Sequence, residues 1–191
     1  MRQHTEILDD GTLDYDETFF SQIEADSLFE ELRTATPWQQ ERSRLGPFPR
    51  LTAWYADAEL TYSYSGVTHE ALPWTPHLLE VRRRAETAAA TPFNSVLLNF
   101  YRDGQDSIGY HSDAEPELGA NPVIASISLG SVRQFVLKHV KTGEKLKFDL
   151  ASGSLMVMGG SCQHHWVHCV PKTKAAVGPR INLTFRNIVA Y

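Results

Sequence analysis

The sequence predicts a mainly β protein of the α+β class, in which the C-terminal half forms a β-sandwich or jelly roll. From residue 94 onward, short apolar runs alternate with turns that contain Gly, Asp and Pro, as in antiparallel sandwiches. Before that point, the pattern is one of helical spacing and proline-containing loops. We therefore expect one domain over residues 1–191, with an N-terminal part at 1–93 and a β-rich part at 94–191.

Two helices and several irregular segments are expected in the N-terminal part. Apolar residues at helical spacing indicate the helices, and the second opens with Thr75-Pro76, a frequent helix start. Arginines interspersed with Pro and Gly indicate an exposed basic loop. In chain order we expect an irregular lead-in at 1–16, a helix at 24–35, a loop at 37–50, strands near 51–56 and 61–65, and a helix at 76–91.

The β-rich part should contain seven strands, because seven apolar runs are separated by turn residues. Runs of this length suit strands better than helices. The expected strands are Ser95–Tyr101, Val123–Leu129, Arg133–His139, Lys145–Asp149, Ser154–Met158, His165–Val170 and Arg180–Arg186.

The composition is that of an ordinary globular protein and argues against several other classes. It is 42% hydrophobic, and no apolar run approaches the roughly 18 residues that a membrane span needs. Residues 1–10 lack the basic and apolar regions of a signal peptide. The two cysteines, Cys162 and Cys169, are too few for a disulfide framework. We therefore expect a cytoplasmic protein without a membrane partner, and we expect a monomer.

Charge is distributed unevenly along the chain, although the net value is only −5. Residues 1–31 hold ten acids and one base, whereas residues 32–191 hold 13 acids and 17 bases. Residues 131–191 alone carry nine bases against two acids. Because a polyanion responds to the local field, this basic half is compatible with a nucleic-acid partner. A charged surface that is simply solvated explains the same numbers equally well.

A His-x-Asp pair and a distant histidine form the most informative pattern in the chain. His111 and Asp113 are two residues apart, so they would share one face of an extended strand. With His168 they would complete the two-histidine, one-carboxylate triad that is typical of non-haem Fe(II) oxygenases. Alone, a His-x-Asp pair often occurs by chance. His164 and His165 compete for the third position, and strand alternation favours His168.

The last expected strand adds a polar face that is unusual for a core strand. Period two places apolar residues on one face and four polar residues on the other, namely Arg180, Asn182, Thr184 and Arg186. Buried arginine is costly unless it meets an anion, and a small dicarboxylate would satisfy both guanidinium groups. Asn99 and Tyr101 share a face of an earlier strand and could donate hydrogen bonds to the same acid. The alternatives are a solvated edge strand and a purely structural Asn-Tyr pair.

Taken together, these motifs resemble the AlkB family of Fe(II)/2-oxoglutarate-dependent dioxygenases. The order Asn-x-Tyr, His-x-Asp, His and Arg-x-Asn-x-Thr-x-Arg matches the family, and the resemblance covers residues 37–189. Residues 49–55 and 92–95 are most similar to the branch that contains human AlkB homologues two and three. The resemblance implies a double-stranded β-helix (jelly-roll) core with N-terminal helices and a nucleotide-recognition lid.

The resemblance also implies roles for the matched residues. The metal ligands, which are also the catalytic residues, would be His111, Asp113 and His168. The contacts of 2-oxoglutarate would be Asn99, Tyr101, Arg180, Asn182 and Arg186. In the family pattern Arg186 would pair with the distal carboxylate of the cosubstrate, and Arg180 would lie near the metal. Fe(II), with 2-oxoglutarate and O2 as cosubstrates, is therefore expected.

Aromatic residues of the lid are the first candidates for substrate binding. Tyr62 and Tyr64 lie in a segment that resembles the lid motif whose aromatics grip a flipped base. Trp38 aligns with a lid tryptophan. Without the resemblance, all three are better explained as core aromatics.

Charged residues are the second group of substrate candidates. Glu115 matches an acidic position of the family's substrate pocket, and a carboxylate suits a cationic base. Ala114 departs from the branch, where an acidic residue is common, so the base preference stays open. Arg133, residues 138–147 and residues 42–50 would contact phosphates, which position a nucleic acid without specifying its sequence.

These roles imply oxidative demethylation of alkylated bases, 1-methyladenine and 3-methylcytosine, in DNA or RNA, with release of formaldehyde and succinate. A counterpart of the wedge hairpin used on double strands is not evident, so single strands are favoured. Two alternatives stay open. One is a 2-oxoglutarate-dependent hydroxylase of a protein or a small molecule. The other is a non-enzymatic nucleic-acid-binding module with the metal as a structural clip, which would leave Arg180 and Arg186 without a purpose.

Overall fold

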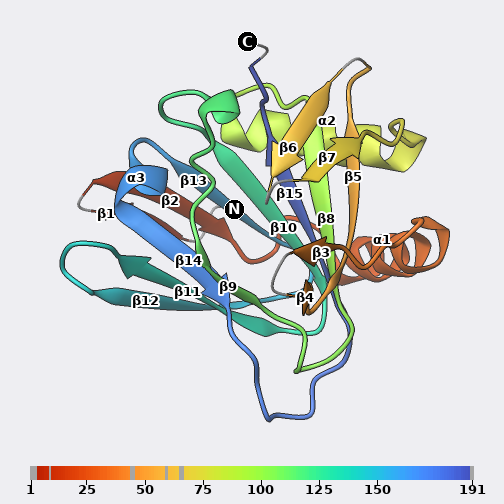
Figure 1. The fold of residues 1–191 in the computed structure, drawn as a ribbon. Coiled ribbons are helices and arrows are strands. Elements are labelled where there is room, and N and C mark those ends of the chain that lie inside the picture. Colours follow the sequence, from red (N-terminus) through yellow and green to blue (C-terminus); the bar gives the residue numbers. More distant parts are fainter. Residues whose placement is uncertain (1–3, 9, 44–45, 59, 65–66, 190–191) are drawn as a thin grey trace.

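Two antiparallel sheets face each other, and two long helices cover the outer face of the larger sheet (Figure 1). This computed structural model describes residues 4–8, 10–43, 46–58, 60–64 and 67–189, with the backbone alone for 4–8, 43, 61–64 and 67–70. The expected fold class, mainly β with a jelly-roll core, is confirmed.

The larger sheet has seven strands in the order β1-β2-β13-β10-β15-β8-β5. In chain order they are β1 (His4–Leu8), β2 (Gly11–Asp16), β5 (Leu51–Ala56), β8 (Ser95–Tyr101), β10 (Ile124–Gly130), β13 (Ser154–Gly159) and β15 (Arg180–Arg186). Three of them precede residue 94, so this sheet crosses the division that we expected between 1–93 and 94–191. A single domain over 1–191 stays a prediction.

The smaller sheet has four strands in the order β12-β11-β14-β9. They are β9 (Ile108–His111), β11 (Arg133–His139), β12 (Lys145–Leu150) and β14 (Trp166–Val170). The seven strands predicted after residue 94 are all present, with ends that differ from the prediction by no more than one residue. Two small hairpins lie apart from the sheets, β3 (Arg42–Ser43) with β4 (Gly46–Pro47), and β6 (Thr61–Tyr64) with β7 (Val67–Glu70).

Both long helices begin at cap residues that their sequences supply. In α1 (Gln22–Ala35), Ser21 and Glu24 form a reciprocal capping box. In α2 (Pro76–Ala89), the Thr75 side chain accepts the N–H of Leu78, and Pro76 takes the first helical position. The remaining helical segments are a 3-10 turn η1 (Pro116–Leu118) and the short helix α3 (Cys162–His165). Among the described residues, no helix is long and apolar enough to cross a membrane.

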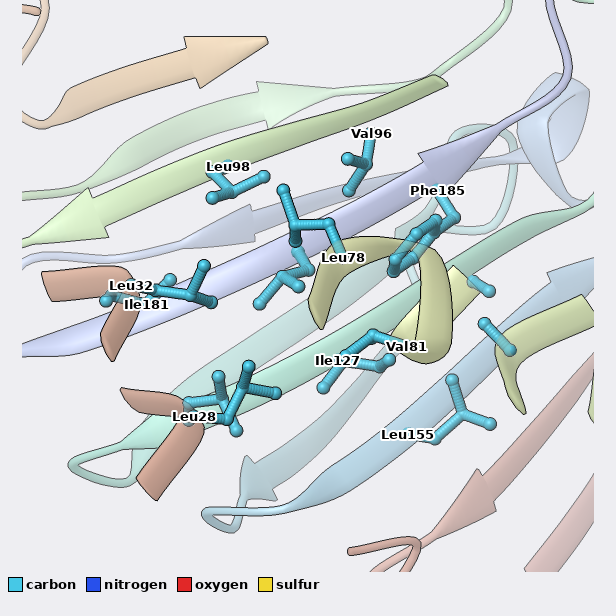
Figure 2. Close-up of a cluster of buried hydrophobic side chains, with 14 of the residues drawn as sticks. Leu28, Leu32, Leu78, Val81, Val96, Leu98, Ile127, Leu155, Ile181 and Phe185 are labelled. Atoms are coloured by element: carbon cyan, nitrogen blue, oxygen red, sulfur yellow. The ribbon is translucent and has the colours of Figure 1, made fainter. Parts of the chain in front are cut away.

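The larger sheet packs one apolar face against the helices, and its other face carries the polar residues of β15 together with apolar residues that pack against the smaller sheet. The apolar side chains of β15 point toward α1 and α2, as the period-two pattern predicts. Burial of this face against the helices stabilises the fold by about 25 cal/mol per Å² of apolar surface removed from water. Figure 2 shows the contact, with Leu28, Leu32, Leu78 and Val81 from the helices facing Val96, Leu98, Ile127, Leu155, Ile181 and Phe185 from the sheet.

The expectation of an irregular lead-in at residues 1–16 is wrong. Residues 4–8 and 11–16 form the β1–β2 hairpin, and β2 pairs with β13. Leu13 is fully buried and lies opposite Met158 in this pairing. The acidic composition concealed the strand, since only one side of β2 is buried and the other carries the polar residues.

Candidate active site

A cavity of about 390 Å³ opens between the two sheets, on the polar face of the larger one. β15 contributes Arg180, Asn182, Thr184 and Arg186 to its wall, and all four are less than one-tenth exposed. β8 contributes Asn99 and Tyr101, which lie directly across from Asn182 and Arg180 in the sheet. The polar face predicted for β15 is therefore buried and lines a cavity, and the solvated edge strand is excluded.

The three predicted metal ligands meet at one end of this cavity. Each of His111, Asp113 and His168 offers a ligand atom within 4.8 Å of the other two. His168 Nε2 lies 3.8 Å from Asp113 Oδ2. The pairing of β14 with β9 places His168 directly opposite His111, with ring centroids 4.3 Å apart. We call these three residues the cavity triad.

The protonation of the cavity triad suits a metal. His111 Nδ1 lies 2.9 Å from the Gly109 carbonyl, so Nδ1–H donates there and Nε2 is the ring nitrogen left for a metal. Burial, with His111 close by, lowers the pKa of His168 to about 3, so its imidazole is neutral. Burial would raise the pKa of Asp113, but the Arg186 guanidinium and the two histidines hold it at about 2. Neutral imidazoles and an ionised carboxylate are the forms that bind metals.

Asp113 reaches the site from a loop, which corrects the expectation that one strand would carry both His111 and Asp113. β9 ends at His111, and Asp113 follows outside it. The Asp113 backbone N–H donates to Gln163 Oε1 at 2.9 Å, and Gln163 is 2% exposed. Gln163 is a supporting residue that sequence reasoning missed, because its place at the site arises only from the tertiary fold.

The two arginines occupy the opposite positions from those expected. Arg186 Nη2 donates to Asp113 Oδ1 at 2.5 Å, so Arg186 lies at the metal end of the cavity. Arg180 lies at the other end of β15, where Nη2 donates to Ser128 Oγ at 2.9 Å and the guanidinium covers the Tyr101 ring. The assignment of Arg186 to the distal carboxylate is therefore wrong in this structure, because its Nη2 already holds the triad carboxylate.

Arg180 is a large buried charge in the cavity wall whose hydrogen-bonding groups are only partly satisfied by the described residues. It is 1% exposed, and its Nε and Nη1 have no hydrogen-bond partner. Burial lowers the pKa of the Arg180 guanidinium. Leaving a buried cation without a counter-ion costs on the order of several kcal/mol, so the arrangement calls for an anion.

Two asparagines of the cavity wall differ in what they still offer to a ligand. Asn182 uses its amide hydrogens on Ser126 Oγ and the Ile127 carbonyl, at 2.8 and 2.9 Å. Its expected role as a direct contact of the cosubstrate is therefore corrected to that of a supporting residue. Asn99 Oδ1 accepts from Arg50 Nε at 2.6 Å, which orients the Asn99 amide.

Arg50 is a cavity residue that we placed in an exposed basic loop. It is 6% exposed, lines the cavity and stacks over Phe48, with the guanidinium carbon 5.0 Å from the ring centre. The expectation of an exposed loop is therefore wrong at this position. A signal was available, since Arg50 directly precedes the buried strand β5, but two nearby arginines and several prolines made the segment look uniformly solvated.

The remaining substrate candidates separate into one residue at the cavity and several elsewhere. Glu115 lines the cavity, and its Oε2 is buried without a hydrogen-bond partner. Trp38 does not line the cavity; it packs against Phe100 with ring centroids 5.1 Å apart, and its indole N–H donates to the Arg33 carbonyl. The lid role of Trp38 is therefore corrected to a core role.

Arg133 and the two lid tyrosines complete the set. Arg133 is 3% exposed and donates to the carbonyls of Asp103, Asp106 and Pro171, so the expectation that it contacts phosphates is wrong. Its hydrogen bonds tie the loop after β8 to the end of β14 instead. Tyr62 and Tyr64 lie on β6, and their side chains fall outside the part of the chain that the structure describes.

A jelly roll that holds a buried two-histidine, one-carboxylate triad beside an arginine-lined cavity defines the class of iron- and 2-oxoglutarate-dependent oxygenases. Residues 13–186 match the model of the 2OG-Fe(II) oxygenase superfamily. Mouse alpha-ketoglutarate-dependent dioxygenase alkB homolog 3 is 43% identical, over 86% of this chain and 62% of the relative. Mouse DNA oxidative demethylase ALKBH2 is 39% identical, over 89% of this chain and 77% of the relative. The chain belongs to the AlkB family of this superfamily.

A solved structure supports the fold independently. The structure of OsALKBH1 superimposes with a TM-score of 0.71 and covers 96% of this chain and 100% of that chain, at 18% sequence identity. At that identity the likeness shows the fold alone. The chain spans only 62% of the length of the mouse alkB homolog 3 that it matches.

Proposed function

We propose that the chain is an Fe(II)- and 2-oxoglutarate-dependent dioxygenase that demethylates 1-methyladenine and 3-methylcytosine in DNA, and also in RNA. One observation carries the proposal. A His-Asp-His triad, of which Asp113 and His168 are buried, and a buried, partly unsatisfied Arg180 face the same cavity. Among the relatives is a mouse DNA oxidative demethylase, which supports the substrate class.

The cavity triad fits Fe(II). Its donor set is two imidazole nitrogens and one carboxylate, which suits Fe(II) and leaves coordination positions for other ligands. His111 Nε2 is the free nitrogen of its ring, because Nδ1 donates to the Gly109 carbonyl. We assign His111, Asp113 and His168 as the ligands, with Arg186 holding the Asp113 carboxylate in place through Nη2.

The far end of the cavity fits the distal carboxylate of 2-oxoglutarate. Arg180 would donate to it through Nη2 together with Nε or Nη1, because each of these pairs forms the planar fork that a carboxylate matches best. Tyr101 lies beneath the guanidinium, and Ser128 Oγ accepts one hydrogen of Nη2 and so helps to orient the group. Asn99, oriented by Arg50, lines the wall between the two ends and is the remaining donor that we assign to the cosubstrate.

The metal, the cosubstrate and the residues of the chain would each contribute a different part of the reaction. When bound, Fe(II) and 2-oxoglutarate would supply O2 activation, with release of succinate and CO2 and hydroxylation of the N-methyl group. The hydroxylated methyl group then leaves the base as formaldehyde. The chain itself shields Asp113 and His168 from water, keeps His168 neutral and Asp113 ionised, and would hold the cosubstrate at the metal.

Glu115 suits the cationic bases produced by methylation at the Watson–Crick edge. Its buried, unpartnered Oε2 lines the same cavity as the triad, and a positively charged base would satisfy it.

A base must leave the stack to reach a cavity between two sheets, and single strands make this less costly. We therefore propose a single-stranded substrate. We also propose a monomer in the cytoplasm, where the two free cysteines would stay reduced.

Formaldehyde release from an oligonucleotide that contains 3-methylcytosine tests the proposal. Fe(II) and 2-oxoglutarate are omitted in turn, and an unmethylated oligonucleotide of the same sequence is the control. We expect release that requires both Fe(II) and 2-oxoglutarate and the methylated base. Succinate formation that ignores the oligonucleotide would favour a hydroxylase of a protein or small molecule, and the absence of both products would contradict a dioxygenase.

A further inference from the structure

Away from the cavity, the structure brings together another set of two imidazoles and one carboxylate. Asp10, His139 and His165 each offer a ligand atom within 4.8 Å of the other two, and we call them the second cluster. Asp10 Oδ2 lies 3.6 Å from His139 Nε2 and 3.8 Å from His165 Nδ1. Ligand atoms in a tetrahedral zinc site lie about 3.3 Å apart, so the two distances from Asp10 would need to close by a few tenths of an ångström, and the distance between the two histidines by no more than about 1.5 Å.

His139 is the observation that points to a ligand. Its side chain is 5% exposed, and Nε2 is buried without a hydrogen-bond partner in the described part of the chain. This nitrogen points into the second cluster, where the Asp10 carboxylate is its nearest charged neighbour. A buried polar atom in a native fold is almost always paired, so an unpaired one at the centre of a donor set suggests a missing partner.

Three separate segments hold the second cluster in place. Asp10 lies in the turn between β1 and β2 at φ 72°, and its carbonyl accepts from Ser161 Oγ at 2.9 Å. His139 ends β11, and His165 ends α3, which contacts β2 (Figure 1). The Val140 N–H donates to the His165 carbonyl at 2.8 Å, which ties these two segments together. The donors are therefore presented by backbone that other contacts already fix.

We propose that the second cluster is a zinc site that fastens the N-terminal β1–β2 hairpin to the smaller sheet. Two imidazoles and a carboxylate form a ligand set that zinc binds. Asp10 and His165 are about half exposed, at 52% and 41% of their side-chain surfaces, which leaves room for water as a fourth ligand. None of the three residues lines the cavity of the triad, so the site takes no part in binding the cosubstrate.

Zinc binding requires a shift of one proton on His139. Its Nδ1 accepts the Thr142 backbone N–H at 3.0 Å, which places the ring proton on Nε2. With zinc on Nε2, that proton moves to Nδ1, where Thr142 Oγ1 at 3.1 Å is the acceptor. The Thr142 N–H then loses this acceptor. The affinity for zinc should therefore be lower than that of a site whose ligands need no change of protonation.

The consequence concerns stability rather than catalysis. β1 is the edge strand of the larger sheet, and β2 joins it to β13. An ion shared by Asp10, His139 and His165 would bind the folded hairpin and not the unfolded chain, so it would stabilise the folded state by mass action.

Zinc binding to the full-length chain tests the proposal, with Zn²⁺ alone as the probe. The starting variant is His111→Ala, because it disables the cavity triad and leaves the second cluster intact. Asp10→Asn and His165→Ala are then added one at a time, and both residues are exposed enough for these substitutions to leave the fold intact. His164→Ala is the matched control, a neighbouring histidine on α3 that lies outside the second cluster.

Isothermal titration should give one zinc per chain in His111→Ala, and the same in its His164→Ala derivative. The Asp10→Asn and His165→Ala derivatives should bind zinc at least about tenfold more weakly. Zinc should also raise the melting temperature of His111→Ala but not of these two derivatives. Absence of zinc binding in His111→Ala, or equal affinity in all four variants, would overturn the proposal.

Discussion

The cavity triad and the second cluster contain the same ligand types, two histidines and one aspartate, in very different surroundings. His168 and Asp113 are both less than one-tenth exposed and lie on a cavity that also contains Arg180. Asp10 and His165 face solvent, and their cluster borders a hairpin rather than a cavity. The donor set tells which metals can bind, whereas the surroundings decide whether a bound metal can meet a cosubstrate and a base.

Electrostatics separate the two clusters as well. Arg186 donates to Asp113 and stabilises its negative charge in a buried place. Asp10 is stabilised mainly by solvent and by the two histidines near it. A buried carboxylate that is already paired with an arginine is ordered before the metal arrives, and such preorganisation is typical of catalytic sites.

Asp113→Asn should have the largest effect. The substitution removes the negative charge that would bind the metal and that pairs with Arg186, so we expect turnover to fall by more than about 100-fold. Formaldehyde release measures it, and Asp149→Asn, at an exposed position of β12, is the control. Near-normal turnover in Asp113→Asn would show that the cavity triad is not the catalytic metal site.

Exchange of the two arginines for lysine should separate their roles. Arg180→Lys should raise the KM for 2-oxoglutarate by about tenfold or more, because an ammonium cannot form the fork that a carboxylate matches. Arg186→Lys should act mainly on kcat and on Fe(II) affinity, since Arg186 holds the triad carboxylate. Steady-state kinetics with 2-oxoglutarate as the varied substrate distinguish them. If Arg186→Lys instead raised the KM for 2-oxoglutarate and Arg180→Lys lowered kcat, Arg186 would be the residue that binds the distal carboxylate.

In the metal-free protein, the free energy of unfolding should depend on pH because His168 and Asp113 have lowered pKa values in the fold. The pKa of His168 is about 3 in the fold, against its usual 6.5, so between these values the unfolded chain binds one more proton. The free energy of unfolding should therefore fall by about 1.4 kcal/mol per pH unit below pH 6.5 from this group. Asp113, with a pKa of about 2 rather than 3.8, adds a further loss below pH 3.8.

Urea unfolding between pH 7 and pH 5, in the presence of a chelator, measures this slope. His168→Gln should flatten it, and His164→Gln should not, because His164 is exposed. Equal slopes in His168→Gln and in the unsubstituted protein would show that His168 is not held neutral by burial.

A charge reversal on the outer face of the smaller sheet should have a smaller effect, which concerns oligonucleotide binding. Lys138 lies directly opposite Lys145 in the β11–β12 pairing, and its Nζ is 5.9 Å from the Tyr110 ring centre. Like charges opposite one another destabilise a sheet unless an anion lies between them, and a phosphate would do so. Lys138→Glu should weaken oligonucleotide binding about tenfold at low salt and reduce the salt dependence.

Fluorescence anisotropy at several salt concentrations measures the affinity for a single-stranded oligonucleotide. Arg83→Glu, which makes the same reversal of charge on α2 at an exposed position, is the control. An equal loss in both variants would mean that only net charge matters and that the smaller sheet does not contact the nucleic acid.

Seven of the eight strands of the C-terminal half were predictable because each has its own apolar run and its own turn signals, whereas β9 (Ile108–His111) has no such run and was missed. The polar face of β15 was also predictable, since alternation fixes which side chains share a face. β1 and β2 were missed because their sequence is dominated by acids, and only Leu13 marks the buried side of β2. Local composition does not reveal a strand whose stability depends on pairing with a distant segment.

The site was predictable in its residues and less so in their roles. His111, Asp113 and His168 were selected by residue type and order, and the fold brings them together. Which arginine faces the metal depends on the register between β15 and the loop after β9, which no pattern specifies. Arg133 looked like a surface cation, and burial of its guanidinium among three backbone carbonyls could not be foreseen from one sequence.

The most direct test compares formaldehyde release by His111→Ala and His164→Ala from the same 3-methylcytosine oligonucleotide. His111 belongs to the buried triad beside Arg180, and His164 is an exposed histidine whose ring contacts the Ala120 carbonyl. We predict no release from His111→Ala, and a rate in His164→Ala within about twofold of the unsubstituted protein. Formaldehyde release by His111→Ala at the normal rate would contradict the assignment of the cavity triad as the catalytic metal site.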